Sequence, residues 1–160
     1  MHNKFKLFFI ILFLNISFTS NVFSNQIFNF DVTELEVTED GNKIKGLNRG
    51  IITTNEGLII NADTFIYDRS LNILKAKGNV KIEDKINKYY IQADSVSYLK
   101  NKEIIFTEGN SKAIDKNNTI TASNFKFDKL KNIITAEKNV KFIDREKETQ
   151  IFSARIIWFL

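Results

Sequence analysis

The sequence predicts an all-β fold built from repeated antiparallel units, with two sheets that face each other across an apolar interior. After residue 24, short runs rich in Ile, Val, Phe, Tyr and Thr alternate with clusters of Asn, Asp, Gly and Lys. Runs of this kind, separated by turn signals at roughly 8–16 residues, are typical of antiparallel strands. The chain has no proline, so that residue restricts no strand to an edge. A period of about 30 residues also runs through this region, as in proteins built from stacked units.

One eight-residue motif, which we call the phrase, recurs with this period. Its four copies are Ile60–Tyr67, Ile91–Tyr98, Ile120–Phe127 and, more faintly, Phe152–Phe159. The alanine in each copy lies 31, 29 and 32 residues after the one before it. One unit of such a repeat cannot bury its apolar face alone, so neighbouring units must stack.

The first arm of each unit contains a change of side-chain parity. Ile60 and Ala62 alternate in one phase, and Phe65 and Tyr67 continue in the other. The same change separates Ile91 and Ala93 from Val96 and Tyr98, and Ile120 and Ala122 from Phe125 and Phe127. Because strand side chains have a period of two, a recurring change of phase predicts a recurring bulge or corner.

The second arm of each unit keeps one parity. Leu74, Ala76, Gly78, Val80 and Ile82 align with equivalent positions in the two later units. Those positions are Ile105, Thr107, Gly109, Ser111 and Ala113, then Ile134, Ala136, Lys138, Val140 and Phe142. The glycines predict a further bend, and Lys138 departs from that pattern in the third unit.

The first 24 residues are predicted to be a signal peptide. Lys4 and Lys6 precede the apolar stretch Leu7–Phe18, and Val22 and Ser24 suit cleavage after Ser24. An uncleaved membrane anchor is the alternative, although the stretch is short for a bilayer span. Residues 25–160 then form one domain, large enough to bury a core.

The composition excludes the side chains most often used in catalysis and in metal binding. The chain has no cysteine, and its one histidine, His2, lies in the predicted signal peptide. The predicted mature protein therefore lacks the commonest general base and the usual zinc ligands, so we expect no enzyme activity, metal or cofactor. Asp63 and Asp94 are equivalent, but Ser123 and Arg155 take their place in the other copies, which favours a solvated corner over a catalytic pair. The interspersed charges form no basic stripe and argue against nucleic-acid binding.

The repeat resembles a known family. In the first unit, Ile60–Asp68 reads Ile-Asn-Ala-Asp-Thr-Phe-Ile-Tyr-Asp, and Leu74–Val80 reads Leu-Lys-Ala-Lys-Gly-Asn-Val. These motifs resemble the organic-solvent-tolerance (OstA-like) family of lipopolysaccharide transport, and the resemblance covers roughly residues 28–158. It implies a taco-like antiparallel β-jellyroll whose apolar groove carries the acyl chains of lipopolysaccharide across the periplasm towards the outer membrane. It also implies partners of the same fold, joined end to end through edge strands, and an outer-membrane barrel partner.

The resemblance and the repeat pattern together select two sets of residues. The expected groove lining is Ile60, Ala62, Phe65, Tyr67, Leu74, Ala76, Val80, Ile91, Ala93, Val96, Tyr98, Ile105, Ile120, Ala122, Phe125, Phe127, Ile134, Ala136, Val140 and Phe142. The expected edge-strand contacts to a partner are Phe28, Phe30, Ile156, Ile157 and Trp158.

Two kinds of family member remain open. The segments Phe28–Val37 and Gly46–Thr54 resemble the start of the N-terminal periplasmic domain of LptD, and the chain ends inside an apolar strand, which suggests a truncated jellyroll. A stand-alone periplasmic bridge protein of the LptA type is the alternative. The rival class is a structural or adhesive exported β-solenoid without lipid cargo, which would share the repeat and the export signal.

Overall fold

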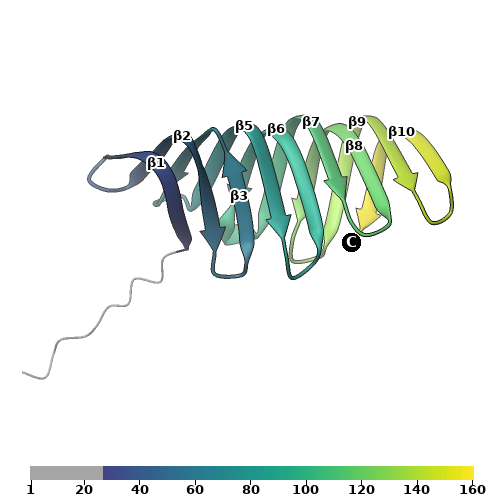
Figure 1. Cartoon of the computed structure of the whole chain (residues 1–160), viewed down its shortest axis with the longest axis horizontal. Coiled ribbons are helices and arrows are strands. Elements are labelled where there is room, and N and C mark those ends of the chain that lie inside the picture. Colours follow the sequence, from purple (N-terminus) through teal and green to yellow (C-terminus); the bar gives the residue numbers. More distant parts are fainter. Residues whose placement is uncertain (1–26) are drawn as a thin grey trace, which may run out of the picture.

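The computed structural model describes residues 27–160, and the predicted signal peptide lies outside them. The described chain is almost entirely strand (Figure 1). The strands are β1 (Phe28–Thr38), β2 (Lys43–Thr54), β3 (Leu58–Ala62), β4 (Thr64–Asp68), β5 (Ile73–Asp84), β6 (Tyr89–Leu99), β7 (Ile104–Ile114), β8 (Asn118–Asp128), β9 (Ile133–Asp144) and β10 (Thr149–Phe159). One short 3-10 turn, η1 (Lys100–Lys102), links β6 to β7. The predicted all-β class is therefore confirmed.

The strands form one continuous antiparallel sheet folded along its middle, where the sequence predicted two sheets. The hydrogen-bonded order is β1-β2-β3-β5-β6-β7-β8-β9-β10, and β4 pairs with β2 and β5. β3 pairs with residues 50–53 of β2, whereas β4 pairs with residues 43–46 of the same strand. Each long strand thus contributes one half to the wall that contains β3 and one half to the wall that contains β4. We call these the β3 wall and the β4 wall.

Every long strand bends where it passes from one wall to the other. The ladder register shifts there, for example between Gln92 and Ser95 on β6 and between Glu108 and Ser111 on β7. Pairs of consecutive residues with positive φ lie on this line, namely Asn48-Arg49, Gly78-Asn79, Gly109-Asn110 and Lys138-Asn139. Left-handed backbone at two successive positions turns a strand sharply, so the predicted corners and glycine bends are confirmed. Lys138 has a φ of 66°, and the third unit therefore makes the same corner without glycine.

The core lies between the two walls. Buried positions alternate along each half-strand, as in the pattern of Leu74, Ala76, Val80 and Ile82 on β5. Aromatic rings from opposite walls meet inside: Phe28 and Tyr67 lie with ring centroids 4.9 Å apart, and Tyr89 and Phe127 5.0 Å apart. Side chains from both walls therefore pack against one another along the interior.

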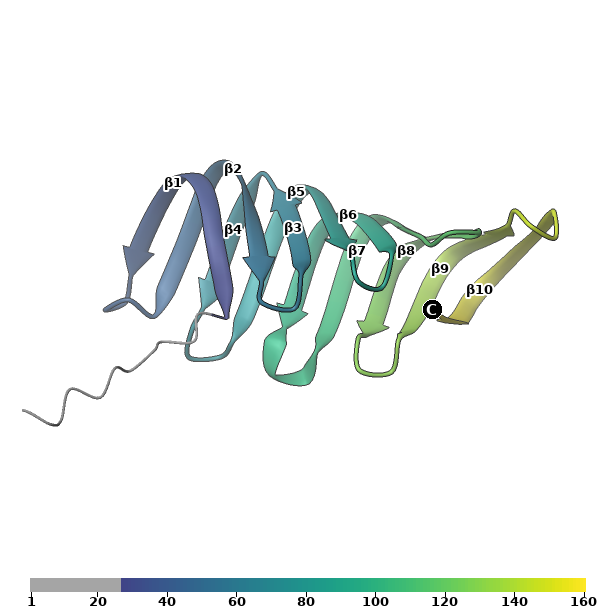
Figure 2. The same cartoon turned by 60° about the horizontal axis from the view of Figure 1, so that its bottom comes forward.

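The two edges of the sheet are β1 and β10. The sheet opens towards β10, where the two halves of the last strands splay apart (Figure 2). Most of β10 is exposed, including Phe152 and Phe159, whereas Trp158 is buried against Phe142. The interior is thus tightly packed in the middle of the molecule and loosely covered at the β10 end.

Candidate functional site

The apolar interior between the walls is the candidate site, and the predicted lining residues all face it. All of them are buried except Phe142, which is partly buried and packs against the core. They fill the interior with their own side chains. A ligand would have to separate the walls and replace these contacts, and the assignment of the lining to a lipid stays a prediction.

Turns at the two rims of the folded sheet face each other across the side of the interior opposite the corner line. We call this side the mouth. The β3 wall ends in the turn between β2 and β3, which carries Glu56, and the β4 wall ends in η1, which carries Lys100. The Lys100 ammonium donates to both carboxylate oxygens of Glu56 at 2.9 Å. This ion pair joins the two walls across the mouth.

A second carboxylate gathers the neighbouring charges on the β4 side of the mouth. Glu103 accepts hydrogen bonds from the Lys100 ammonium, from the Tyr98 hydroxyl at 2.5 Å and from the Lys129 ammonium at 3.0 Å. The two ammonium groups also lie 5.8 Å and 5.4 Å from the centroid of the Tyr98 ring, within cation–π distance. The cluster therefore sits directly above an aromatic ring of the core.

Burial and charge act on these groups in opposite directions. Burial opposes ionisation of Glu103, but hydrogen bonds from Lys100, Tyr98 and Lys129 outweigh it and hold the pKa of this carboxyl below its ordinary value. Burial lowers the pKa of Lys100, yet the bonds to Glu103 and Glu56 leave that pKa raised. Burial and then Glu103 raise the pKa of the Tyr98 hydroxyl. Glu103 and Lys100 are therefore both ionised, and Tyr98 is neutral, at neutral pH.

Tyr89, at the rim of the β3 wall, presents a different feature. Its side chain is buried, and its hydroxyl makes no hydrogen bond of ordinary geometry within residues 27–160. Burial and then the charge of Asp84 raise the pKa of this hydroxyl.

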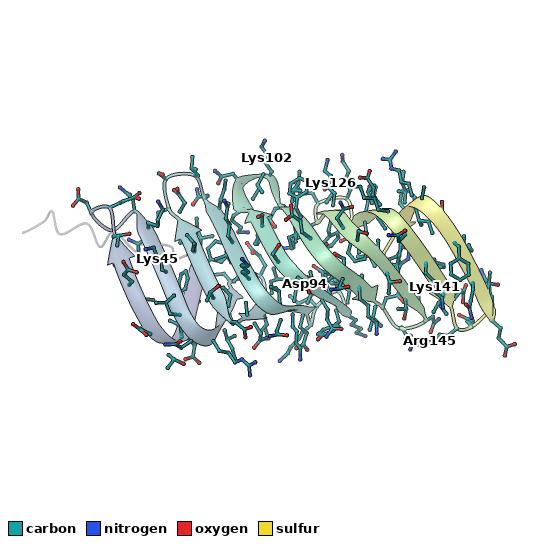
Figure 3. The ribbon with its side chains drawn as sticks, turned by 90° about the horizontal axis from the view of Figure 1, so that it is seen from above. Lys45, Asp94, Lys102, Lys126, Lys141 and Arg145 are labelled. Carbon is teal, nitrogen blue, oxygen red and sulfur yellow. The ribbon has the colours of Figure 1, made fainter. Side chains whose placement is uncertain are left out.

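The corner line on the opposite side of the molecule is polar. The Asp63 carboxylate accepts from the Asn79 amide at 2.7 Å, and Asp94 accepts from Asn110 at 2.9 Å. Figure 3 shows Asp94 between Lys102 and Lys126 on one side and Arg145 on the other. Asp63 and Asp94 therefore brace consecutive corners, as expected for a solvated corner. Shallow hollows along this line are lined mainly by polar and charged residues.

The predicted edge contacts occupy the two edge strands, but their side chains point in different directions. Phe28 and Trp158 are buried, and Phe30 and Ile156 pack partly against the core. Ile157 is half exposed. A partner strand would meet the unpaired backbone of β1 or β10 and, on the outer face, Ile157 in particular. Their role in joining stays a prediction.

Residues 27–160 contain no group of three or more His, Cys, Asp or Glu side chains placed to hold a metal. No helix in this part of the chain has the length and apolar character needed to cross a membrane.

Comparisons with known proteins identify the architecture. No protein-family model matches the chain, and no curated protein matches it. A solved structure does: LptH, the LptA homologous periplasmic component of the conserved lipopolysaccharide transport device from Pseudomonas aeruginosa, with a TM-score of 0.63. The chain has the LptA-type β-jellyroll fold. The match covers 69% of this chain and 82% of LptH at 13% sequence identity, so the jellyroll is shared although few residues are.

The charged cluster of this jellyroll was not predicted from the sequence. Glu56, Lys100 and Lys129 lie in polar clusters that predict turns, and neither they nor Glu103 were predicted to be site residues. The usable signal was their place in the repeat: Lys100 and Lys129 each follow a copy of the phrase by two residues. That the two lysines share one carboxylate depends on how tightly neighbouring units stack.

Proposed function

We propose that this protein is a non-enzymatic periplasmic component of lipopolysaccharide transport that shelters acyl chains between its two walls. One observation carries the proposal: an apolar interior runs without interruption from β1 to β10 in a fold shared with LptH. Transfer of each acyl methylene from water into such an interior contributes about 0.8 kcal/mol. This gain has to offset the loss of the contacts between the walls that the ligand replaces.

The side-chain types of the interior suit a mobile ligand. The lining is aliphatic and aromatic, with few polar groups; the buried hydroxyls Thr107 and Ser111 bond to each other at 2.6 Å. Such a surface offers an acyl chain no fixed polar anchor, so the chain is free to slide along the interior. The sugars of the same lipid would remain in water outside the mouth.

Site-specific photo-crosslinking tests the cargo. A photoreactive residue at Phe65, Tyr98 or Phe125 should be labelled by purified lipopolysaccharide, because these side chains lie between the walls. Lys131, whose side chain is largely exposed, is the control position. Labelling at the interior positions no stronger than at Lys131 would contradict the proposal and favour a β-solenoid without cargo.

We also propose that β1 and β10 join partner jellyrolls end to end, including a partner attached to an outer-membrane barrel. Both strands have one unpaired side, which is the geometry that strand addition requires. Along β10, successive N–H groups point alternately towards β9 and away from it. Ile156→Pro and Ile157→Pro therefore remove N–H groups that point in opposite directions. The outward variant is the one that removes an N–H pointing away from β9, and the inward variant removes an N–H that pairs with β9.

The outward variant should keep its stability and lose association with a purified partner jellyroll, measured by site-specific crosslinking between the two proteins. The inward variant should lose stability as well, because it breaks the ladder to β9. Undiminished association of the outward variant would exclude β10 as the junction.

A further inference from the structure

The charged cluster at the mouth joins the two walls and indicates how the interior opens. We propose that the ion pair between Glu56 and Lys100 is a clasp that closes the mouth and has to open before an apolar ligand enters. The inference rests on the proposed function, since it assigns a step to the same interior. It concerns residues in turns, which the groove assignment did not include.

The clasp spans the mouth, whereas most other ion pairs do not. Glu56 belongs to the turn that ends the β3 wall, and Lys100 to the turn that ends the β4 wall. The pair Lys45–Glu36, by contrast, joins two directly paired residues of β1 and β2 within the β4 wall. Breaking Lys45–Glu36 changes nothing across the mouth, so it provides a matched control.

The two sides of the clasp differ in how firmly they are held. The Lys100 and Glu103 side chains are 13% and 20% exposed, and Lys129 is 11% exposed. Glu56 is 56% exposed and makes its only described ion pair, within residues 27–160, to Lys100. Glu103 therefore still binds both lysines when Glu56 moves away. Opening does not leave the ammonium group of Lys100 or Lys129 buried without a partner.

Opening at this point would uncover the core. The Tyr98 ring lies beneath Lys100 and Lys129 and meets the Phe28 ring of the opposite wall edge-on, with centroids 5.9 Å apart. Phe28 also contacts Tyr67. The clasp thus covers the aromatic contacts that join the two walls, and a ligand between the walls has to separate these same rings.

Cross-linking provides the direct test, because the chain has no cysteine of its own. In the variant Glu56→Cys/Lys100→Cys, a short reducible bis-thiosulfonate reagent would bridge the two walls. A spacer is needed because the long side chains meet at their tips and leave the backbones too far apart for a direct disulfide. The control variant, Glu36→Cys/Lys45→Cys, receives the same bridge within one wall.

Each variant would carry a photoreactive residue at Phe125 and be exposed to purified lipopolysaccharide. With the mouth bridged, labelling should fall at least about tenfold and return after reduction, while the control stays unchanged. Equal labelling of the bridged and reduced forms would overturn the clasp and leave the proposed function intact. No interior labelling in any form, including the reduced and unmodified proteins, would reject the proposed function and the clasp's part in it.

A second measurement needs no lipid. Ala113, a buried residue of β7 on the β3 wall, would be replaced by cysteine and its reaction with a maleimide followed over time. Adding Glu56→Gln should raise the labelling rate by about fivefold, the effect of removing one favourable ion pair from an opening equilibrium. Glu36→Gln is the control and should leave the rate unchanged. Equal rates in both variants would show that Glu56 does not close the mouth.

Discussion

At the residue scale, the corners show how one side chain decides whether another position needs glycine. Gly78 has a φ of 81°, and a Cβ atom there would lie 2.5 Å from the Asp63 carboxylate. Gly109 faces Asp94 in the same way. In the third unit Ser123 replaces the aspartate, and Lys138 takes the glycine position with a φ of 66°. The glycine is therefore required by the carboxylate as much as by the backbone.

Replacing Gly78 with alanine should accordingly destabilise the protein by about 2 kcal/mol, from the left-handed backbone and the contact with Asp63. Denaturant unfolding measures the effect. In the background Asp63→Ser, the cost of Gly78→Ala should shrink, because the short hydroxyl leaves room for the Cβ. Lys138→Ala is the control and should change stability by less than about 0.5 kcal/mol. An equal cost in both backgrounds would mean that the backbone conformation alone requires glycine.

The Glu103 carboxyl at the mouth predicts that the stability of the fold depends on pH. Hydrogen bonds from Lys100, Tyr98 and Lys129 overcome the effect of burial and lower the pKa of Glu103 below its ordinary value of 4.5. A depressed carboxyl pKa stabilises the fold above the unfolded pKa, and this stabilisation is lost as the pH falls through the folded pKa. The free energy of unfolding should therefore decrease as the pH is lowered below about 4.5. Glu103→Gln should be less stable at pH 7 and should show a shallower decrease in acid; the same acid slope in both proteins would contradict this.

At the element scale, each bulge removes a ladder contact that something else must replace. In β7 the register shifts between Glu108 and Ser111. The Thr107 hydroxyl, next to the shift, accepts a hydrogen bond from the backbone N–H of Phe125 at 2.9 Å and pairs with the Ser111 hydroxyl. A buried threonine thus completes the corner of β7 and β8. The sequence showed Thr107 only as a polar residue at a position that is aliphatic in the other units.

Thr107→Val should therefore cost about 1–3 kcal/mol, because it removes the hydroxyl that accepts from the buried Phe125 N–H and leaves the Ser111 hydroxyl only its bond to the Ser123 carbonyl. Thr135→Val, on β9 and only half-buried, is the control and should stay within about 0.5 kcal/mol. Thermal unfolding compares the two. A stable Thr107→Val protein would indicate that water replaces the lost hydroxyl at the corner.

At the scale of the whole molecule, stability is unevenly distributed along the stack. The central units bury their lining completely, whereas the β10 end is open: Ile91 is fully buried, and Ile151 is 46% exposed. Because each unit packs mainly on its neighbours, local stability should follow this gradient. The open end therefore leaves apolar side chains such as Ile151 and Phe152 exposed.

Ile91→Ala should therefore destabilise the protein by about 2–5 kcal/mol, whereas Ile151→Ala should cost less than about 1 kcal/mol. Hydrogen exchange would place the difference in the chain: amides of β5 to β7 should lose protection in Ile91→Ala, and only β9 and β10 in Ile151→Ala. Equal costs would show that the β10 end is packed as firmly as the centre.

The sequence by itself determined the strands, the period and the corners, because these depend on local alternation of side chains. The phase change between Ala62 and Phe65 predicts a bulge wherever the strand lies, and residues such as Tyr98 and Phe125 are inward-facing in any arrangement that obeys the repeat. The expected lining residues are inward-facing as the repeat predicts, whereas the buried Ile44, Ile52, Leu58 and Tyr89 lie outside the repeated motifs and were not predicted.

Only the tertiary structure decided how far the walls approach each other and what holds them together. The sequence predicted two facing sheets, whereas the long strands run through both walls and make one sheet. Aromatic side chains from the two walls meet in the middle. The contact between Glu56 and Lys100 joins turns 44 residues apart in different units. Such a contact depends on the angle between the walls, a property of the whole stack that no local pattern of residues encodes.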